Sequence, residues 1–131
     1  MNDNYTMCLS IADKLDAIVN GDYYKCPECE ETFDTSEMDS VCCPHCGNAE
    51  DIEVYDLYDY LSDTDLYDIE YRTGNNREYR SVCIMIACGG PNIYIDTKAK
   101  AVELYWWGNH EHALLSDSVI DAIDEYFAEF V

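Results

Sequence analysis

Apolar residues near the N-terminus recur every three or four positions, which is the spacing of one helix face. This pattern predicts a helix over 4–20, and Asn20 and Gly21 supply a C-terminal stop. A second helix is predicted after the N-cap signal Ser116-Asp117. The apolar face of the first helix comprises Tyr5, Cys8, Leu9, Ala12, Leu15, Ile18 and Val19. That of the second comprises Val119, Ile120, Ile123, Tyr126, Phe127 and Phe130.

From residue 66 onward the apolar period changes to two, which predicts β-strands. Turn-forming residues separate about four strands, expected near 66–72, 78–88, 93–95 and 102–106. Gly108 and Asn109 are expected to end the last strand. We therefore predict an α+β fold, in which an antiparallel meander of about four strands over 66–107 has the N- and C-terminal helices packed on one face.

Shorter elements are expected between the first helix and the meander. Residues 55–65 fit a short amphipathic helix, and Tyr23-Tyr24 and 52–54 fit short strands. The chain has 131 residues, which suits one compact domain over 1–131 with a small insertion over 22–54.

Eight cysteines include two copies of the pattern C-P-x-C, at 26–29 and 43–46. Such a turn places two thiolates on one side of a tight loop, and Zn²⁺ prefers four ligands in a tetrahedron. The paired turns resemble the knuckles of the zinc ribbon family. The resemblance implies one structural Zn²⁺ in a four-cysteine zinc-ribbon site, held by Cys26, Cys29, Cys43 and Cys46, with no open position for catalysis. Cys42 or His45 could serve as the metal ligand in place of Cys43, but either would break the symmetry of the two turns. The remaining Cys8, Cys83 and Cys88 are expected to be core residues.

The charge is strongly negative, because 7 Lys and Arg oppose 28 Asp and Glu for a net charge of −21. No Lys or Arg occurs between Lys25 and Arg72. A segment of this kind repels nucleic acid phosphates and anionic membranes, so direct binding to either is not expected. We expect the acids to face a positively charged protein partner instead. The candidate partner-binding residues are Asp56, Asp59, Asp63, Asp65, Asp68, Glu70, Asp121, Asp124 and Glu125.

Two strand segments, Gly89–Thr97 and Val102–Gly108, are similar to stretches of small phage and prophage proteins. Together with the two cysteine turns, the chain resembles phage-encoded type II-A anti-CRISPR proteins. The resemblance implies stoichiometric binding to Cas9 and prevention of target DNA binding or cleavage. Because Cas9 holds its nucleic acids in positively charged channels, the acidic composition is compatible with this expectation.

The sequence is also compatible with two other functions. The first is a zinc-ribbon adaptor in phage or bacterial transcription or replication, although such ribbons often bind nucleic acid through basic residues, which are absent here between Lys25 and Arg72. The second is a metalloenzyme that uses His110 and His112, but both histidines are expected in a loop where no third metal ligand lies nearby. The sequence contains no Walker A, G-x-G-x-x-G, G-x-S-x-G or H-E-x-x-H motif, so we do not expect an enzyme.

The sequence contains no apolar run long enough to cross a bilayer and no signal-peptide pattern at its N-terminus. We therefore expect a cytoplasmic protein, located in the host bacterial cell if it is phage-encoded. The high net charge of one sign favours a monomer.

Overall fold

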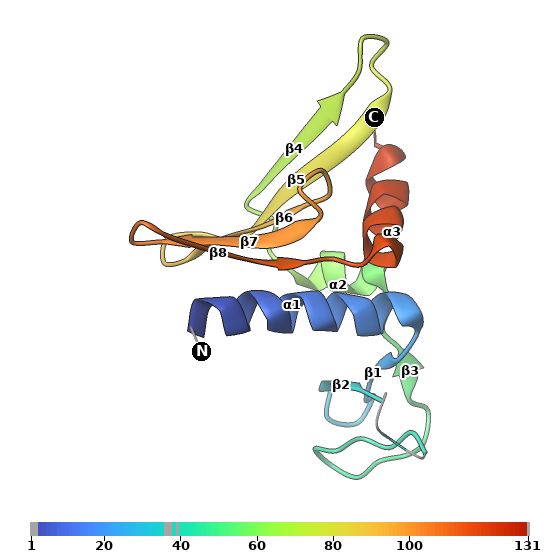
Figure 1. Cartoon of the computed structure of the whole chain (residues 1–131). Coiled ribbons are helices and arrows are strands. Elements are labelled where there is room, and N and C mark those ends of the chain that lie inside the picture. The colour runs from blue at the N-terminus through green and yellow to red at the C-terminus, as the bar shows by residue number, and fades with distance from the viewer. Residues whose placement is uncertain (1–2, 36–37, 39, 131) are drawn as a thin grey trace.

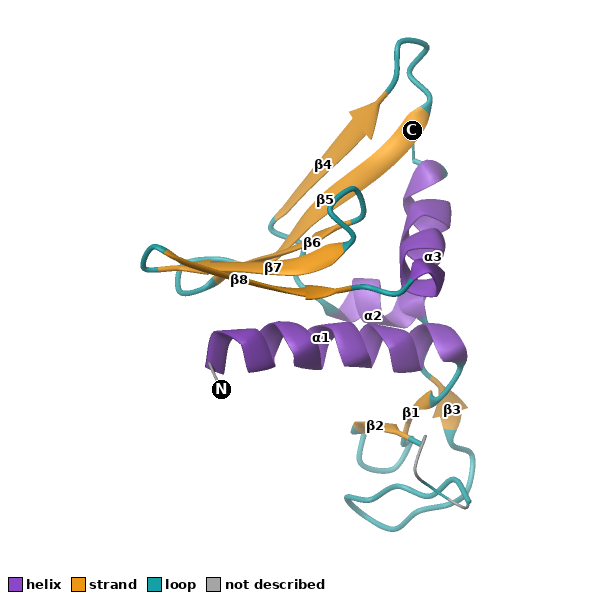
Figure 2. Cartoon of the chain, viewed as in Figure 1, coloured by secondary structure: helices purple, strands orange, loops and turns teal. Residues whose placement is uncertain are grey.

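A computed structural model describes residues 3–35, 38 and 40–130 (Figures 1 and 2). In chain order the elements are α1 (Asp3–Asn20), β1 (Tyr23–Lys25), β2 (Thr32–Asp34), β3 (Glu53–Val54), α2 (Leu57–Asp63), β4 (Asp68–Thr73), β5 (Tyr79–Ala87), β6 (Asn92–Asp96), β7 (Ala101–Trp106), β8 (Asn109–Leu114) and α3 (Asp117–Ala128). The larger sheet has the order β4-β5-β6-β7-β8 and the smaller one β2-β1-β3. All pairings are antiparallel. The predicted α+β fold, with a meander and helices near both ends, is confirmed.

The meander has five strands rather than about four. Trp107 and Gly108 both adopt positive φ angles, 53° and 79°. They form a two-residue turn of the kind that suits the twist of a hairpin, so Trp106 pairs with Asn109 and β8 follows. The prediction that Gly108 and Asn109 end the sheet was therefore wrong, as was the loop expected around His110 and His112.

The predicted helices are confirmed, with small differences at their ends. Helix α2 begins after Asp56, whose carboxylate accepts a hydrogen bond from the Asp59 N–H while the Asp59 carboxylate accepts one from the Asp56 N–H. Helix α3 begins after Ser116, whose hydroxyl oxygen accepts a hydrogen bond from the Val119 N–H, as expected of an N-cap. Among the described residues, no helix has the length and apolar character needed to span a membrane.

The main core lies between the three helices and one face of the five-stranded sheet. Helices α1, α2 and α3 lie on one side of this sheet (Figure 1). Alternation along the strands directs one set of side chains toward them. Fully buried members include Leu15 on α1, Ile123 and Phe127 on α3, and Ile84 and Leu104 on the sheet. Burial of each such side chain contributes about 1.5–3 kcal/mol. The opposite face of the sheet carries no helix in the described part of the chain.

The three-stranded sheet and its loops form a small sheet unit that lies below α1 in Figure 1. Its smaller core contains Cys26, Phe33 and Cys43. This unit contacts the rest of the molecule through aromatic rings. The rings of Tyr23 and Tyr55 lie 5.7 Å apart, edge to face. The Lys14 ammonium of α1 lies 5.4 Å from the Tyr23 ring and 5.5 Å from the Tyr60 ring of α2. One cation therefore contacts the small sheet and α2 from α1.

An ion pair joins strands β4 and β6 across β5. Arg72 donates to both Asp96 oxygens, at 2.7 and 3.0 Å, and Asp96 is 7% exposed. The backbone N–H groups of Lys98 and Ala99 also donate to this carboxylate. Burial raises the pKa of Asp96, but the Arg72 guanidinium and these two N–H groups outweigh it and hold the pKa below its usual value. The charged form of Asp96 therefore stabilises the folded state.

Asp96→Asn tests this contribution through its pH dependence. Because the pKa is lowered in the folded state, the stabilisation is present above the unfolded pKa of about 3.9 and is lost as the pH falls through the folded value. At pH 7 the substitution should lower the free energy of unfolding by about 1.5–3 kcal/mol, the range for a hydrogen bond to a charged group. Urea unfolding followed by circular dichroism should show this difference shrinking below pH 4. A difference that stays constant down to pH 2 would contradict the assignment.

Candidate metal centre and charged surfaces

The four cysteines of the two C-P-x-C turns lie together in the small sheet unit. Their Sγ atoms are all within 4.8 Å of one another. Cys26 lies 3.6 Å from Cys46, and Cys29 lies 3.5 Å from Cys43, between sulfur atoms. Four sulfurs at about 2.3 Å from a tetrahedral metal ion are separated by about 3.8 Å, so the arrangement has the dimensions of a metal site. Cys42 and His45 are outside this group.

Both turns have the same backbone geometry. In the first, the Cys26 carbonyl accepts from the Glu30 N–H at 2.9 Å, and in the second the Cys43 carbonyl accepts from the Gly47 N–H at 2.8 Å. The residue after the second cysteine has a positive φ in both, 63° at Glu30 and 80° at Gly47. Only the second turn has the residue type that adopts this conformation without steric cost.

Hydrogen-bond donors surround the Cys26 sulfur. The side-chain amide of Asn48 donates to it at 3.7 Å. Burial raises the pKa of Cys26, but backbone donors at Cys29 and Glu28 and the Asn48 amide outweigh it and lower the pKa to about 6. Asn48 was not among the residues predicted for this site, because nothing in its spacing shows that its amide reaches a sulfur.

The neighbouring thiols behave differently. A backbone hydrogen bond from Glu31 lowers the pKa of Cys29, but burial and the nearby sulfurs of Cys43, Cys26 and Cys46 outweigh it and raise the pKa to about 12. The pKa of Cys46 is also raised: a backbone hydrogen bond from Asn48 lowers it, and burial and the Cys26 sulfur raise it by more. One thiolate thus forms readily near neutral pH, whereas several thiolates together need a cation between them. The donor set fits a divalent metal ion that prefers thiolate ligands.

The other three predicted core cysteines have different environments. Cys8 is fully buried against the sheet, as predicted. Cys83 is half-buried and Cys88 is exposed, so these two predictions were wrong. The alternation along β5 places Cys83 on the face away from the helices, and β5 ends at Ala87, before Cys88. An apolar run alone does not show which face of a strand is covered.

The first group of candidate partner-binding acids lies on α2, in the loop that follows it and on the edge strand β4. We call residues 56–70 the acidic segment. Of its six acids, Glu70 lies 3.8 Å from Arg72, while the other five have no ion pair within the described residues. Within this segment Tyr60 is buried, but Tyr58 and Tyr67 are exposed. The six acids are Asp56, Asp59, Asp63, Asp65, Asp68 and Glu70.

The second group of candidate acids lies on α3, close to cations of the same chain. Asp121 and Asp124 line a pocket of 570 Å³ between α3 and the sheet, which Arg80, Lys98 and Lys100 also line. Asp124 accepts a hydrogen bond from the Tyr79 hydroxyl at 2.6 Å. Glu125 is exposed and does not line this pocket. These three cations therefore partly offset the negative charge of Asp121 and Asp124, whereas the acidic segment has no comparable group of cations around it in the described part of the chain.

His110 and His112 point to the open face of the sheet, since they alternate with the buried Ala113 on β8. The His110 ring stacks on Tyr105 at 4.4 Å, and its Nε2 lies 3.2 Å from Glu103 Oε2. Among the described residues, the four cysteines are the one group of three or more ligand-type side chains close enough to hold a metal ion. The two histidines do not belong to such a group.

The positive φ at Glu30 gives a direct test of the cysteine turns. Glu30→Gly should raise the free energy of unfolding of the small sheet unit by about 1 kcal/mol, and Gly47→Ala should lower it by about 1–2 kcal/mol. Thermal unfolding and the rate of metal loss to a chelator, after loading with Zn²⁺, measure both effects. Gly90→Ala is the matched control, because an added methyl group at Gly90 meets no atom within 4 Å and its φ is not positive. Equal behaviour of all three variants would contradict this interpretation.

Comparison of the chain with protein-family models, with curated proteins and with solved structures finds no match.

Proposed function

We propose that the chain is a zinc-stabilised binding protein whose acidic segment docks on a basic, nucleic-acid-handling surface of a protein partner. Cas9 is the partner to test first, because the sequence resembles type II-A anti-CRISPR proteins. The observation that carries the proposal is the acidic segment itself, where five carboxylates lie within 13 residues without a cationic partner in the described residues. A partner surface that normally holds phosphates supplies the missing positive charge.

Zn²⁺ is the proposed metal. Cys26, Cys29, Cys43 and Cys46 would hold it, and four thiolates leave no position for water, so its contribution is structural. Among its described residues, the small sheet unit has three buried apolar ones, too few to fold without such support. Native mass spectrometry should find one Zn²⁺ per chain.

Support for a protein partner also comes from the side chains between the acids. Tyr58 is 64% exposed and Tyr67 is 54% exposed. Tyrosine combines a large apolar ring with a polar tip and is enriched at protein interfaces. The acids would steer the approach of a basic surface, and the rings would supply contact area once the two surfaces meet.

The test is inhibition of DNA cleavage by Cas9 loaded with guide RNA. In one variant, Asp56, Asp59, Asp63, Asp65 and Asp68 are all replaced by Asn, which retains the helix cap and the acceptor for the Tyr55 hydroxyl. The matched control neutralises five exposed acids of the small sheet unit, namely Glu28, Glu31, Glu50, Asp51 and Glu53, by Gln or Asn. Both variants have the same net charge.

Wild type and control should inhibit at equimolar amounts, and the acidic-segment variant should need at least about tenfold more protein. Inhibition should also weaken as the salt concentration rises. Equal loss in both variants would contradict the acidic segment as the interface. Absence of binding to Cas9 at low salt would remove Cas9 as the partner, and a shift of bare DNA by the purified protein would favour the zinc-ribbon adaptor.

A further inference from the structure

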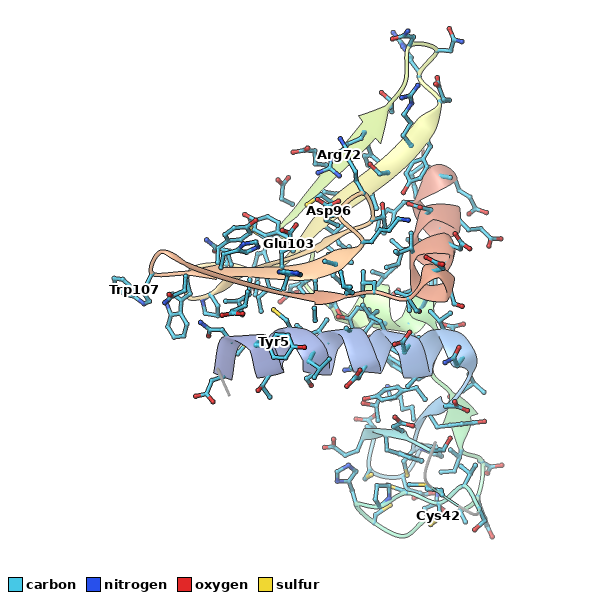
Figure 3. All side chains as sticks on the ribbon, viewed as in Figure 1. Tyr5, Cys42, Arg72, Asp96, Glu103 and Trp107 are labelled. Atoms are coloured by element: carbon cyan, nitrogen blue, oxygen red, sulfur yellow. The ribbon has the colours of Figure 1, made fainter. Side chains whose placement is uncertain are left out.

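The open face of the five-stranded sheet contains a recess between β5, β6 and β7. Its volume is 420 Å³, at the lower end of the range of about 300–1,000 Å³ typical of small-ligand sites. Figure 3 shows Asp96, Glu103 and Arg72 on the side of the sheet that faces away from α1. The recess is lined by Cys83, Asn92, Tyr94, Asp96, Glu103 and Tyr105. None of these residues belongs to the acidic segment or the cysteine cluster.

Two tyrosine rings form adjacent walls of this recess. Tyr94 and Tyr105 have ring centroids 5.9 Å apart and ring planes at 78°, so one ring presents its edge to the other. The His110 ring lies parallel to Tyr105 at 4.4 Å and supports it from the side of β8. Aromatic faces attract cations through the negative potential above the ring.

Of the two carboxylates in the recess, Glu103 is the one without a Lys or Arg partner among the described residues. Its side chain is 19% exposed. Its Oε2 accepts a hydrogen bond from the Tyr105 hydroxyl and lies 3.2 Å from His110 Nε2, and no described group donates to its Oε1. A half-buried carboxylate with one oxygen that accepts no hydrogen bond from a described group favours a cation that completes its hydrogen bonds.

The second carboxylate of the recess already has its cation, because Asp96 is held by Arg72. The electrostatic potential in the recess remains negative, as its effect on two neighbouring groups indicates. Burial, and next the Asp96 carboxylate, raise the pKa of the Cys83 thiol to about 11. Burial and Glu103 likewise raise the pKa of Tyr105. Both groups stay neutral at physiological pH, so the recess offers aromatic faces and one carboxylate with a free oxygen.

An exposed indole lies at the tip of the β7–β8 hairpin, two residues after Tyr105 of the recess. Trp107 is 86% exposed and has a φ of 53°, a conformation that an L-residue adopts at a cost of about 1–2 kcal/mol (Figure 3). Asn or Gly is the favoured residue at this position of a two-residue turn. A strained and exposed tryptophan contributes nothing to the core, and tryptophan is enriched among residues that dominate protein interfaces.

We propose that this recess binds the arginine side chain of a protein partner, with the guanidinium against the rings of Tyr94 and Tyr105 and hydrogen-bonded to Glu103. Guanidinium is planar, always charged and weakly hydrated, so it can stack on tyrosine and pair with a carboxylate at once. The exposed Trp107, at the tip of the hairpin whose strand β7 carries Glu103 and Tyr105, favours a side chain presented by a protein over a free small molecule. The inference rests on the proposed function, for which it supplies the chemistry of a specific contact to a basic partner.

The test uses the full Zn²⁺-loaded chain and three capped tripeptides, Gly-Arg-Gly, Gly-Lys-Gly and Gly-citrulline-Gly. Citrulline has the shape of arginine without its charge. Titration followed by ¹H–¹⁵N NMR should shift amides of 92–96 and 103–105 with the arginine peptide. The lysine peptide should bind more weakly, and the citrulline peptide should leave these amides unchanged.

Glu103→Gln should weaken arginine binding by about tenfold or more, and Tyr94→Leu should also weaken it. Glu31→Gln, at an exposed acid outside the recess and the acidic segment, is the control with the same change in charge and should bind as wild type does. The NMR spectrum of each variant verifies its fold. Unchanged binding in Glu103→Gln, equal binding of lysine, or shifts spread over the acidic segment would overturn the proposal. Because the peptides test the recess without any particular protein partner, failure of this experiment can be distinguished from failure of the Cas9 assay.

Discussion

Repulsion among carboxylates is the constraint to which the rest of this structure adapts. With 28 acids and 7 bases, the fold has few cations to place. Arg72 connects β4 and β6 through Asp96, and Lys14 lies where α1, α2 and the small sheet meet. Hydroxyl groups stabilise other carboxylates in place of cations: Tyr55 donates to Asp63, Tyr79 to Asp124 and Ser116 to Asp16. Neutral donors satisfy an acid without using any of the scarce positive charge.

The cysteine cluster and the acidic segment are linked through Tyr55. This residue follows β3, its ring contacts Tyr23 of β1, and its hydroxyl bonds to Asp63 at the end of α2. The cysteine turns determine where β1 and β3 lie, because Cys26 directly follows β1. A metal ion held by the thiolates would therefore stabilise the start of the acidic segment as well as its own loops. The small sheet unit is in this sense a support for α2.

Local chemistry explains which features the sequence predicted and which it did not. The cysteine turns and the Ser116 cap were found because their residues act on groups a few positions away. Strand β8 was missed because its inward positions hold Glu111 and Ala113, which give no apolar alternation. Arg72 and Asp96 meet across a strand, 24 residues apart, and their pairing follows only from the sheet register. Glu103 was missed for the same reason, since its environment is built from neighbouring strands.

The placement of the two tryptophans has a spectroscopic consequence. Trp106 and Trp107 are adjacent, are 39% and 86% exposed, and both lie at the β7–β8 tip, whereas the main core contains tyrosine and phenylalanine but no tryptophan. Tryptophan fluorescence therefore reports on solvent exposure at this hairpin tip and should change little when the main core unfolds. The same emission would respond strongly to any macromolecule that covers this tip. The chain thus contains its own fluorescent probe for the tip of the β7–β8 hairpin.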